Sequence, residues 1–192
     1  MKIGVISDTH GDLTAWRKAL AGPFLEAELI LHAGDILYHG PKNPMVEGYG
    51  PKDLAEAINA SAAPVVIARG NCDSDVDQLV IDFPIQSPYA FVQAEDLRIL
   101  LGHGDGLSRQ DMWQEARRYK ADIRIFGHIH QPVLEKQGDL VLFNPGSPAL
   151  PKGPRPTVGL VDARTRTVSL IDLDSSEVLQ QISLCRPGHG KD

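Results

Sequence analysis

Five short apolar segments, each followed at once by a cluster of polar residues, constrain the fold of this chain more than any other feature of its sequence. The segments are rich in valine, isoleucine and leucine and nearly continuous, which is typical of strands buried on both faces. They comprise residues 3–6, 29–31, 65–68, 97–101 and 123–126. Helical patterns lie between several of them, at 13–21, 51–60 and 108–119. Pro51 suits a first helical position and Ser108 suits an N-cap. This alternation predicts an α/β fold.

The polar clusters come directly after the predicted strands. They read Asp8-Thr9-His10, Gly34-Asp35, Gly70-Asn71-Cys72-Asp73, Gly102-His103-Gly104-Asp105 and Gly127-His128-Ile129-His130. In open α/β sheets ligands bind outside the carboxyl ends of the strands, so we expect five strand ends at one sheet edge to bring the clusters together. Four of the clusters begin with a glycine, which permits a sharp turn and a close approach of the backbone to a ligand.

The side chains in these clusters predict a metal site. They are two aspartates, one asparagine and four histidines: Asp8, Asp35, Asn71, His10, His103, His128 and His130. Oxygen and imidazole ligands suit manganese, iron, zinc, cobalt or nickel better than copper(I). Seven ligands exceed the needs of one ion and suit two ions that share a bridging carboxylate. A single Gly-Asp pair is typical of a turn, but five clusters that each follow a strand favour a binding site. His32, by contrast, is expected to pack or to cap within its own strand.

The later part of the chain has a different character. Its short apolar runs are separated by turns without a helical pattern, which predicts meandering antiparallel strands. The runs lie at 140–143, 157–161, 168–173 and 178–184. We expect one domain over 1–184, with a two-sheet core covered by helices, and a flexible tail over 185–192. The glycine- and proline-rich segment 39–53 predicts a long loop, which is either a functional lid or contact surface or an irregular connection.

Composition narrows the classes of function. Hydrophobic residues make up 42% and charged residues 23% of the 192 residues, which is ordinary globular usage and argues against disorder. The formal net charge is −6, so a groove that follows a nucleic-acid backbone is not expected. Two cysteines make no disulfide framework, and no apolar run approaches the roughly 20 residues of a membrane span. We therefore expect a cytoplasmic protein that carries no secretory leader.

The five clusters together resemble the motif series of the calcineurin-like metallophosphoesterases. That series is Asp-x-His, Gly-Asp, Gly-Asn-His-(Asp/Glu), Gly-His and Gly-His-x-His, and all five elements occur here in that order between residues 8 and 130. Further segments resemble the YfcE-like subgroup of small bacterial phosphodiesterases. They include His39-Gly40-Pro41-Lys42-Asn43, Glu47-Gly48-Tyr49, Asn144-Pro145-Gly146-Ser147 and Pro151-Lys152-Gly153. The resemblance implies a four-layer α/β/β/α sandwich of two mixed β-sheets.

The same resemblance implies an assignment of ligands and an activity. The first ion would be held by Asp8, His10, Asp35 and His130, and the second by Asp35, Asn71, His103 and His128. Asp35 would bridge two divalent ions, with Mn²⁺ expected ahead of iron, zinc, cobalt or nickel. The implied reaction is hydrolysis of a small phosphodiester by in-line attack of a hydroxide that bridges the ions. Asn71, His103 and Arg69 are candidates for contacting the substrate, although Arg69, like Lys152 and Arg155, could equally be a surface charge.

One departure from the family pattern bears on catalysis. The larger family has a histidine after the metal-binding asparagine, where it can protonate the leaving oxygen, and here that residue is Cys72. Cys72 and Asp73 are candidates for the leaving-group side of the site. A thiol is a weak replacement, so good leaving groups such as aryl esters should be favoured. Asp105 is expected either to orient His103 or to serve as a turn residue.

Two other functions are weighed against the phosphodiesterase. A metal-binding scaffold with little or no catalysis is one, because a retromer subunit has the implied fold and also lacks the acid histidine. The complete ligand set and the loop at 39–53 favour the enzyme. A nuclease is the other, and the acidic charge balance makes it the weaker of the two. A homo-oligomer stays open, since the loop and the β-rich end both offer contact surfaces.

Overall fold

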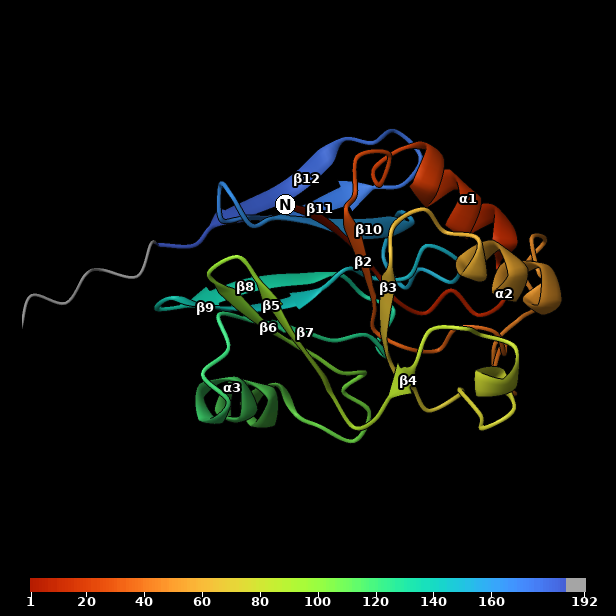
Figure 1. Ribbon diagram of the computed structural model, residues 1–192, viewed down its shortest axis with the longest axis horizontal. Helices are drawn as coiled ribbons and strands as arrows, with labels where there is room; N and C mark the ends of the chain where they lie inside the picture. Colours follow the sequence, from red (N-terminus) through yellow and green to blue (C-terminus); the bar gives the residue numbers. More distant parts are fainter. Residues whose placement is uncertain (186–192) are drawn as a thin grey trace, which may run out of the picture.

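The computed structural model describes residues 1–185, which form two mixed β-sheets packed face to face with helices outside them (Figure 1). The first sheet has the order β12-β11-β10-β1-β2-β3-β4, and the second has the order β5-β6-β7-β9-β8. The first contains β1 (Lys2–Ile6), β2 (Leu29–His32), β3 (Val65–Ala68), β4 (Ile85–Gln86), β10 (Thr157–Asp162), β11 (Thr167–Asp172) and β12 (Val178–Ser183). The second contains β5 (Ala90–Ala94), β6 (Leu97–Leu101), β7 (Ile123–Ile125), β8 (Val133–Gln137) and β9 (Leu140–Asn144).

The helices begin and end where local sequence signals predict. They are α1 (Leu13–Ala21), α2 (Pro51–Asn59), the 3-10 helix η1 (Asp77–Leu79) and α3 (Arg109–Arg118). Asp12 caps α1 by accepting from the backbone of Ala15, and Pro51 begins α2. Ser108 and Asp111 form a capping box at the start of α3, which satisfies two backbone N–H groups that the helix cannot pair itself.

The described residues are packed in four layers around three apolar cores. Val5 of β1 lies between the sheets in one core with Phe143, whereas the next residue, Ile6, lies in the core under α1 with Trp16. Successive strand residues point to opposite faces, so one apolar strand contributes to two cores. The third core lies between the second sheet and α3, around Trp113. The helices α1 and α2 thus cover one sheet and α3 covers the other, which confirms the predicted α/β/β/α sandwich (Figure 1).

The strands that precede the polar clusters come from both sheets. In the first sheet β1, β2 and β3 are parallel, and in the second β6, β7 and β9 are parallel. The expectation that all five clusters share the edge of one sheet is therefore wrong. Their carboxyl ends still meet, because the two sheets pack face to face and loops from one reach loops from the other. The backbone N–H of His128, after β7, donates to the carboxylate of Asp8, after β1.

The predicted antiparallel meander is only partly correct. The strands β10, β11 and β12 pair antiparallel, but β9 lies in the other sheet, parallel to β7 and antiparallel to β8. Every residue of β9 is buried, as expected of a central strand covered on both faces, whereas β12 is largely exposed. The strands β4, β5 and β8 were not among the predicted runs.

Two further expectations concern the C-terminal tail and segments that could cross a membrane. The predicted tail begins at Cys185, which is exposed, and residues 186–192 lie outside the described residues. The domain boundary at residue 184 stays a prediction. Within residues 1–185, no helix combines the length and apolar character that crossing a membrane demands.

Candidate metal centre

Loops that follow five strands bring all seven predicted ligands to one end of the sandwich. The first group lies around Asp8 and combines loops after β1 and β7. His130 Nε2 is 3.3 Å from Asp8 Oδ1, and His10 Nε2 is 3.1 Å from His130 Nε2. All three side chains are buried, and their donor atoms lie within 4.8 Å of one another, close enough to hold one metal ion.

A second group lies around His103 and combines loops after β3, β6 and β7. His103 Nε2 is 3.4 Å from Asp35 Oδ2 and 3.2 Å from Asn71 Oδ1. The ring of His128 lies edge-on to that of His103, with centroids 5.2 Å apart. His10 Nε2 of the first group is 3.7 Å from the same oxygen of Asp35. The Asp35 carboxylate therefore lies between the two groups.

The hydrogen bonds of the histidines test whether the first group fits a cation. His10 Nδ1 lies 2.8 Å from the carbonyl of Tyr38, and His130 Nδ1 lies 2.9 Å from the carbonyl of Leu150. A carbonyl only accepts, so each Nδ1 carries a proton and Nε2 is the ring nitrogen directed at the centre. The two Nε2 atoms face each other beside a carboxylate, an arrangement that a bound cation would stabilise. A backbone carbonyl behind each imidazole is also the usual support for a metal-binding histidine.

The charged groups of the second group influence one another strongly. Burial opposes charge on Asp35 and His103 alike, but their mutual attraction outweighs it. The pKa of Asp35 is held well below its usual range, and the neighbouring carboxylates raise the pKa of His103 to about 9. His103 Nδ1 donates to the carbonyl of Ala33 at 2.7 Å, which fixes the ring. The positive charge on His103 thus lies against the Asp35 carboxylate, in the position that a bound metal cation would take over as the imidazole gives up its proton.

Backbone strain accompanies the ligands. Five of the seven have a left-handed backbone, which side-chain-bearing residues rarely adopt, with φ angles of 54° at Asp8, 45° at His10, 58° at Asp35, 68° at His128 and 57° at His130. Such conformations persist only where the surrounding structure enforces them, and they cluster at functional sites. Here they turn each side chain away from its strand and toward the shared centre.

The close approach of two loops depends on a pair of glycines. A side chain added to Gly34, whose φ is +98°, would have its Cβ 2.5 Å from the backbone nitrogen of Gly70. Any Cβ at either position would force apart the loops after β2 and β3. Gly34 and Gly70 therefore serve packing between the two loops, in addition to the turn predicted from sequence.

The ligands border an open cleft of about 330 Å³. Its lining includes six residues of the predicted site, together with a loop segment and a lysine: His10, Asp35, Asn71, Cys72, His128 and His130, with Gly40, Pro41, Lys42, Asn43 and Lys152. Segment 40–43 of the predicted long loop therefore forms one wall of the site. The ammonium groups of Lys42 and Lys152 are the cations of this cleft within the described chain.

Cys72 occupies the cleft as a neutral thiol. Its backbone N–H donates to Asp35 Oδ1 at 2.8 Å. Burial, followed by the nearby Asp35 carboxylate, raises the pKa of the Cys72 thiol to about 12. Its sulfur also lies within 4.8 Å of donor atoms of His10 and Asp35.

Asp73 does not face the cleft, so its predicted place on the leaving-group side is wrong. The side chain is buried, and both carboxylate oxygens accept backbone N–H groups, from Asp35, Ile36 and Gly70 at 2.7–2.9 Å. Asp73 instead ties the loop after β2 to the loop after β3.

Arg69, which was predicted with Asn71 and His103 to contact the substrate, lies outside the cleft. Its Nε donates to the carbonyl of Asp73 at 3.0 Å, and its guanidinium pairs with Asp75. It borders a neighbouring cavity with His103. Arg155 pairs with Asp172, away from the site.

The orienting partner of His103 is the carbonyl of Ala33, so the orienting role considered for Asp105 is wrong, and Asp105 lies in a turn as the alternative expected. Sequence reasoning missed all three supporting carbonyls, because a backbone carbonyl carries no signature in the residue that bears it. His32 is buried within its strand, as predicted. Its ring bonds Thr9 and accepts from Gly34 N–H, and burial lowers its pKa to about 4.

Comparisons with known proteins agree with this architecture. Residues 1–166 match the model of the calcineurin-like phosphoesterase superfamily domain. The chain is 37% identical to Phosphodiesterase YfcE of Escherichia coli K12 over 187 residues, covering 96% of this chain and 98% of that protein.

Solved structures share the fold. The structure of YfcE, a phosphoesterase from E. coli, superposes with a TM-score of 0.81 at 35% identity, covering 96% of this chain and all (100%) of that one. Vacuolar protein sorting 29 from Cryptosporidium parvum superposes with a TM-score of 0.68 at 21% identity, over 95% of this chain and 97% of that one. The second likeness concerns the fold alone. The matched domain and the extent of identity show that this chain belongs to the calcineurin-like phosphoesterase superfamily.

Proposed function

We propose that this protein is a phosphodiesterase that uses two divalent metal ions, with Mn²⁺ as the expected metal, to hydrolyse a small phosphodiester. The observation that carries this proposal is the position of Asp35, whose Oδ2 lies 3.7 Å from His10 Nε2 and 3.4 Å from His103 Nε2. One carboxylate between two sets of imidazoles suits a pair of ions better than a single ion. The identity to YfcE, named a phosphodiesterase, supports the reaction class.

We assign the ligands of each ion as the family resemblance implies. Asp8, His10, Asp35 and His130 would hold one ion, and Asp35, Asn71, His103 and His128 would hold the other. When bound, such ions offset the charge of a diester and lower the pKa of the attacking water.

The residues of the chain would bind and orient the substrate around that centre. Lys42 and Lys152 add positive charge to the wall of the cleft, where they would attract the diester anion. The carbonyls behind His10, His103 and His130 keep each ring in a single orientation.

Cys72 is the candidate for protonating the leaving oxygen, and its thiol is poorly suited to that step. A thiol whose pKa is raised to about 12 is a weak proton donor at neutral pH. Esters whose leaving group is stable as an anion, such as aryl diesters, should therefore react faster than alkyl diesters.

The test is hydrolysis of bis-p-nitrophenyl phosphate by chelator-treated protein, with and without added Mn²⁺. We expect turnover only with metal, two ions per chain by elemental analysis, and loss of turnover in Asp35→Asn. Asp139→Asn, in an exposed turn, is the matched control and should behave like the parent. If two ions bind but no divalent metal gives turnover, a metal-binding scaffold becomes the better description. Turnover that persists in excess chelator would contradict the proposal outright.

A further inference from the structure

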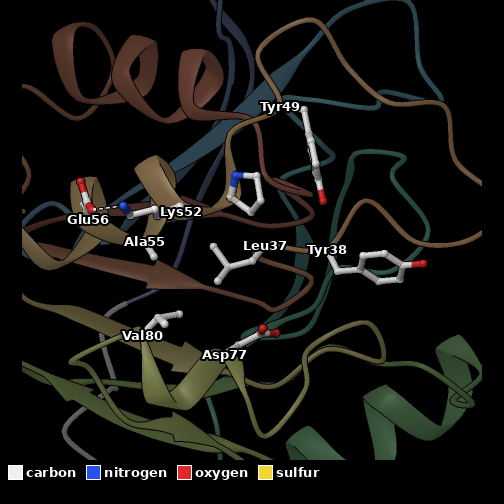
Figure 2. Close-up of a pocket in the computed structure, with 9 residues that line it drawn as sticks. Leu37, Tyr38, Tyr49, Lys52, Ala55, Glu56, Asp77 and Val80 are labelled. Atoms are coloured by element: carbon white, nitrogen blue, oxygen red, sulfur yellow. Dashed lines mark ion pairs between the residues drawn. The ribbon is translucent and has the colours of Figure 1, made fainter.

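A second cavity, of about 510 Å³, lies beside α2 (Figure 2). Its wall consists mainly of apolar and aromatic side chains, with three charged groups at the rim. The lining residues are Leu37, Tyr38, Tyr49, Pro51, Lys52, Ala55, Glu56, Asp77 and Val80. They come from the loop after β2, from α2 and from η1 with the residue that follows it.

The loop after β2 separates this cavity from the metal cleft. Residues 40–43 line the cleft, whereas Leu37, Tyr38 and Tyr49 line the cavity. The two spaces have no lining residue in common. The cavity is therefore a separate site and not an extension of the cleft.

The wall of the cavity has the composition of a small-molecule site. Leu37 points into it between Tyr49 on one side and Val80 and Asp77 on the other (Figure 2). Leu37 and Ala55 are buried and form the floor, but Tyr38 is 42% exposed and Val80 is 49% exposed. Sites for small organic ligands usually have this size and combine an apolar wall with a few polar groups. Exposed apolar side chains around a hollow also indicate a surface that a ligand covers.

The charged groups at the rim favour a ligand of positive charge. Lys52 Nζ is 3.9 Å from Glu56 Oε1, so these two charges largely offset each other. Asp77 Oδ2 accepts from the backbone of Ser74 at 2.8 Å. Within residues 1–185, neither a lysine nor an arginine forms an ion pair with Asp77. The His39 ring packs against both tyrosine rings, with centroids 4.7 Å from Tyr38 and 5.3 Å from Tyr49, so the three form an aromatic cluster on this side of the cavity.

We propose that this cavity binds a small organic cation, with a flat apolar body against Tyr38, Leu37 and Tyr49 and its positive group toward Asp77. The proposal is independent of the phosphodiesterase activity, because none of these side chains is a predicted metal ligand. It adds a binding site of defined ligand chemistry to the molecule.

Isothermal titration with two probes of similar shape and opposite charge tests the proposal. The probes are naphthylmethylammonium and naphthoate, added to the full chain supplied with Mn²⁺. We expect the cation to bind about tenfold more tightly than the anion at neutral pH. Equal affinity for the two probes, or no binding of the cation at millimolar concentration, would overturn the proposal.

Matched variants locate the binding. Asp77→Asn keeps an oxygen for the Ser74 N–H but removes the charge, so the preference for the cation should fall toward parity. Asp75→Asn removes a charge from the same loop at a residue outside the cavity, and it should keep the preference. Val80→Phe fills the cavity from an exposed position and should abolish binding of the cation. Ala55→Met offers a second way to fill it if the first variant folds poorly. Binding that survives in a folded, filled variant would place the probe elsewhere and refute the site.

Discussion

At the scale of single residues, the candidate metal centre depends on how each imidazole is held from behind. Three of the four histidine ligands have their Nδ1 against a backbone carbonyl, from Tyr38, Ala33 and Leu150. This leaves Nε2 as the atom that faces the centre. Hydrogen bonds of this kind fix the ring orientation before any ligand arrives, so little ordering is needed on binding.

Cys72 is the residue whose replacement should improve the proposed activity. Cys72→His would put a group with a pKa near neutrality where the thiol now lies, so it should raise turnover of diesters with alkyl leaving groups. The measurement compares turnover of an alkyl and an aryl diester by the parent and the variant. Cys185→His, at an exposed position, is the control. An unchanged or lower rate on the alkyl diester would count against a leaving-group role for this position.

Asp73 should matter for stability and not for chemistry. Asp73→Ala removes the acceptor for three buried backbone N–H groups, so the free energy of unfolding should fall by about 3 kcal/mol. Asp75→Ala, two residues later and 93% exposed at its side chain, should change it by less than about 1 kcal/mol. Urea unfolding measures both values. Equal losses in the two variants would show that the Asp73 carboxylate does not tie the loops together.

At the scale of secondary-structure elements, the site depends on loops that approach more closely than side chains allow. The glycines after β2 and β3 touch, which places Asp35 beside the loop that carries Asn71. Neighbouring parallel strands end at the same edge of the sheet. The loops that follow them therefore leave the sheet side by side.

Gly34→Ala should separate these loops. Its φ of +98° costs about 1–2 kcal/mol for a residue with a side chain, and the new Cβ would in addition lie 2.5 Å from the Gly70 nitrogen. We expect a large loss of stability together with loss of Mn²⁺ binding. Gly106→Ala has a similar φ of +74° but open space around its Cβ, so it should show the backbone cost alone. Thermal unfolding and metal titration of both variants compare the two effects. Intact metal binding in a folded Gly34→Ala protein would disprove the requirement for close approach.

The turn between β11 and β12 should make stability depend on pH in acid. Backbone N–H groups of Ser175 and Asp174, together with Arg155, hold the pKa of Asp172 below its usual range. A carboxyl group with a lowered pKa stabilises the fold fully above its unfolded-state pKa, which is about 3.9, and this contribution is lost as pH falls through the folded-state value. Asp172→Asn should therefore be less stable than the parent near neutrality, with the difference shrinking in acid. Urea unfolding at several pH values measures it, and a difference that stays constant with pH would contradict the argument.

At the scale of the whole molecule, two sheets hold the halves of the site. Asp8, His10, Asp35 and Asn71 follow strands of the first sheet, and His103, His128 and His130 follow strands of the second. The apolar core between the sheets therefore sets the separation of these two sets of side chains. Each proposed ion would be held by side chains from both sets and would in turn link the sheets.

Removing metal should consequently loosen the sandwich at this end. Metal that binds only the folded state at one hundred times its dissociation constant stabilises by about 2.7 kcal/mol. We expect chelator to lower the melting temperature, added Mn²⁺ to restore it, and Asp35→Asn to lose the response. Hydrogen exchange should rise mainly in the loops around residues 34–40 and 128–130. A melting temperature that chelator leaves unchanged would argue against metal coupling the sheets.

The sequence by itself determined the local features of this protein. These features are the strand ends, the helix at 13–21 and the cap at Ser108. They depend on residues only a few positions apart in the sequence. The seven ligand candidates are visible because their side chains carry the chemistry. The motif order also identified the family correctly.

Only the tertiary structure decided what depends on distant partners. It placed β9 in the second sheet, because strands pair laterally with segments that are distant in the sequence. It showed that Asp73 connects two loops and does not face the cleft. It also revealed the backbone carbonyls that hold the histidines. The sequence does not distinguish a carboxylate that faces a cleft from one that accepts hydrogen bonds from three buried N–H groups. Its role depends on which backbone folds around it.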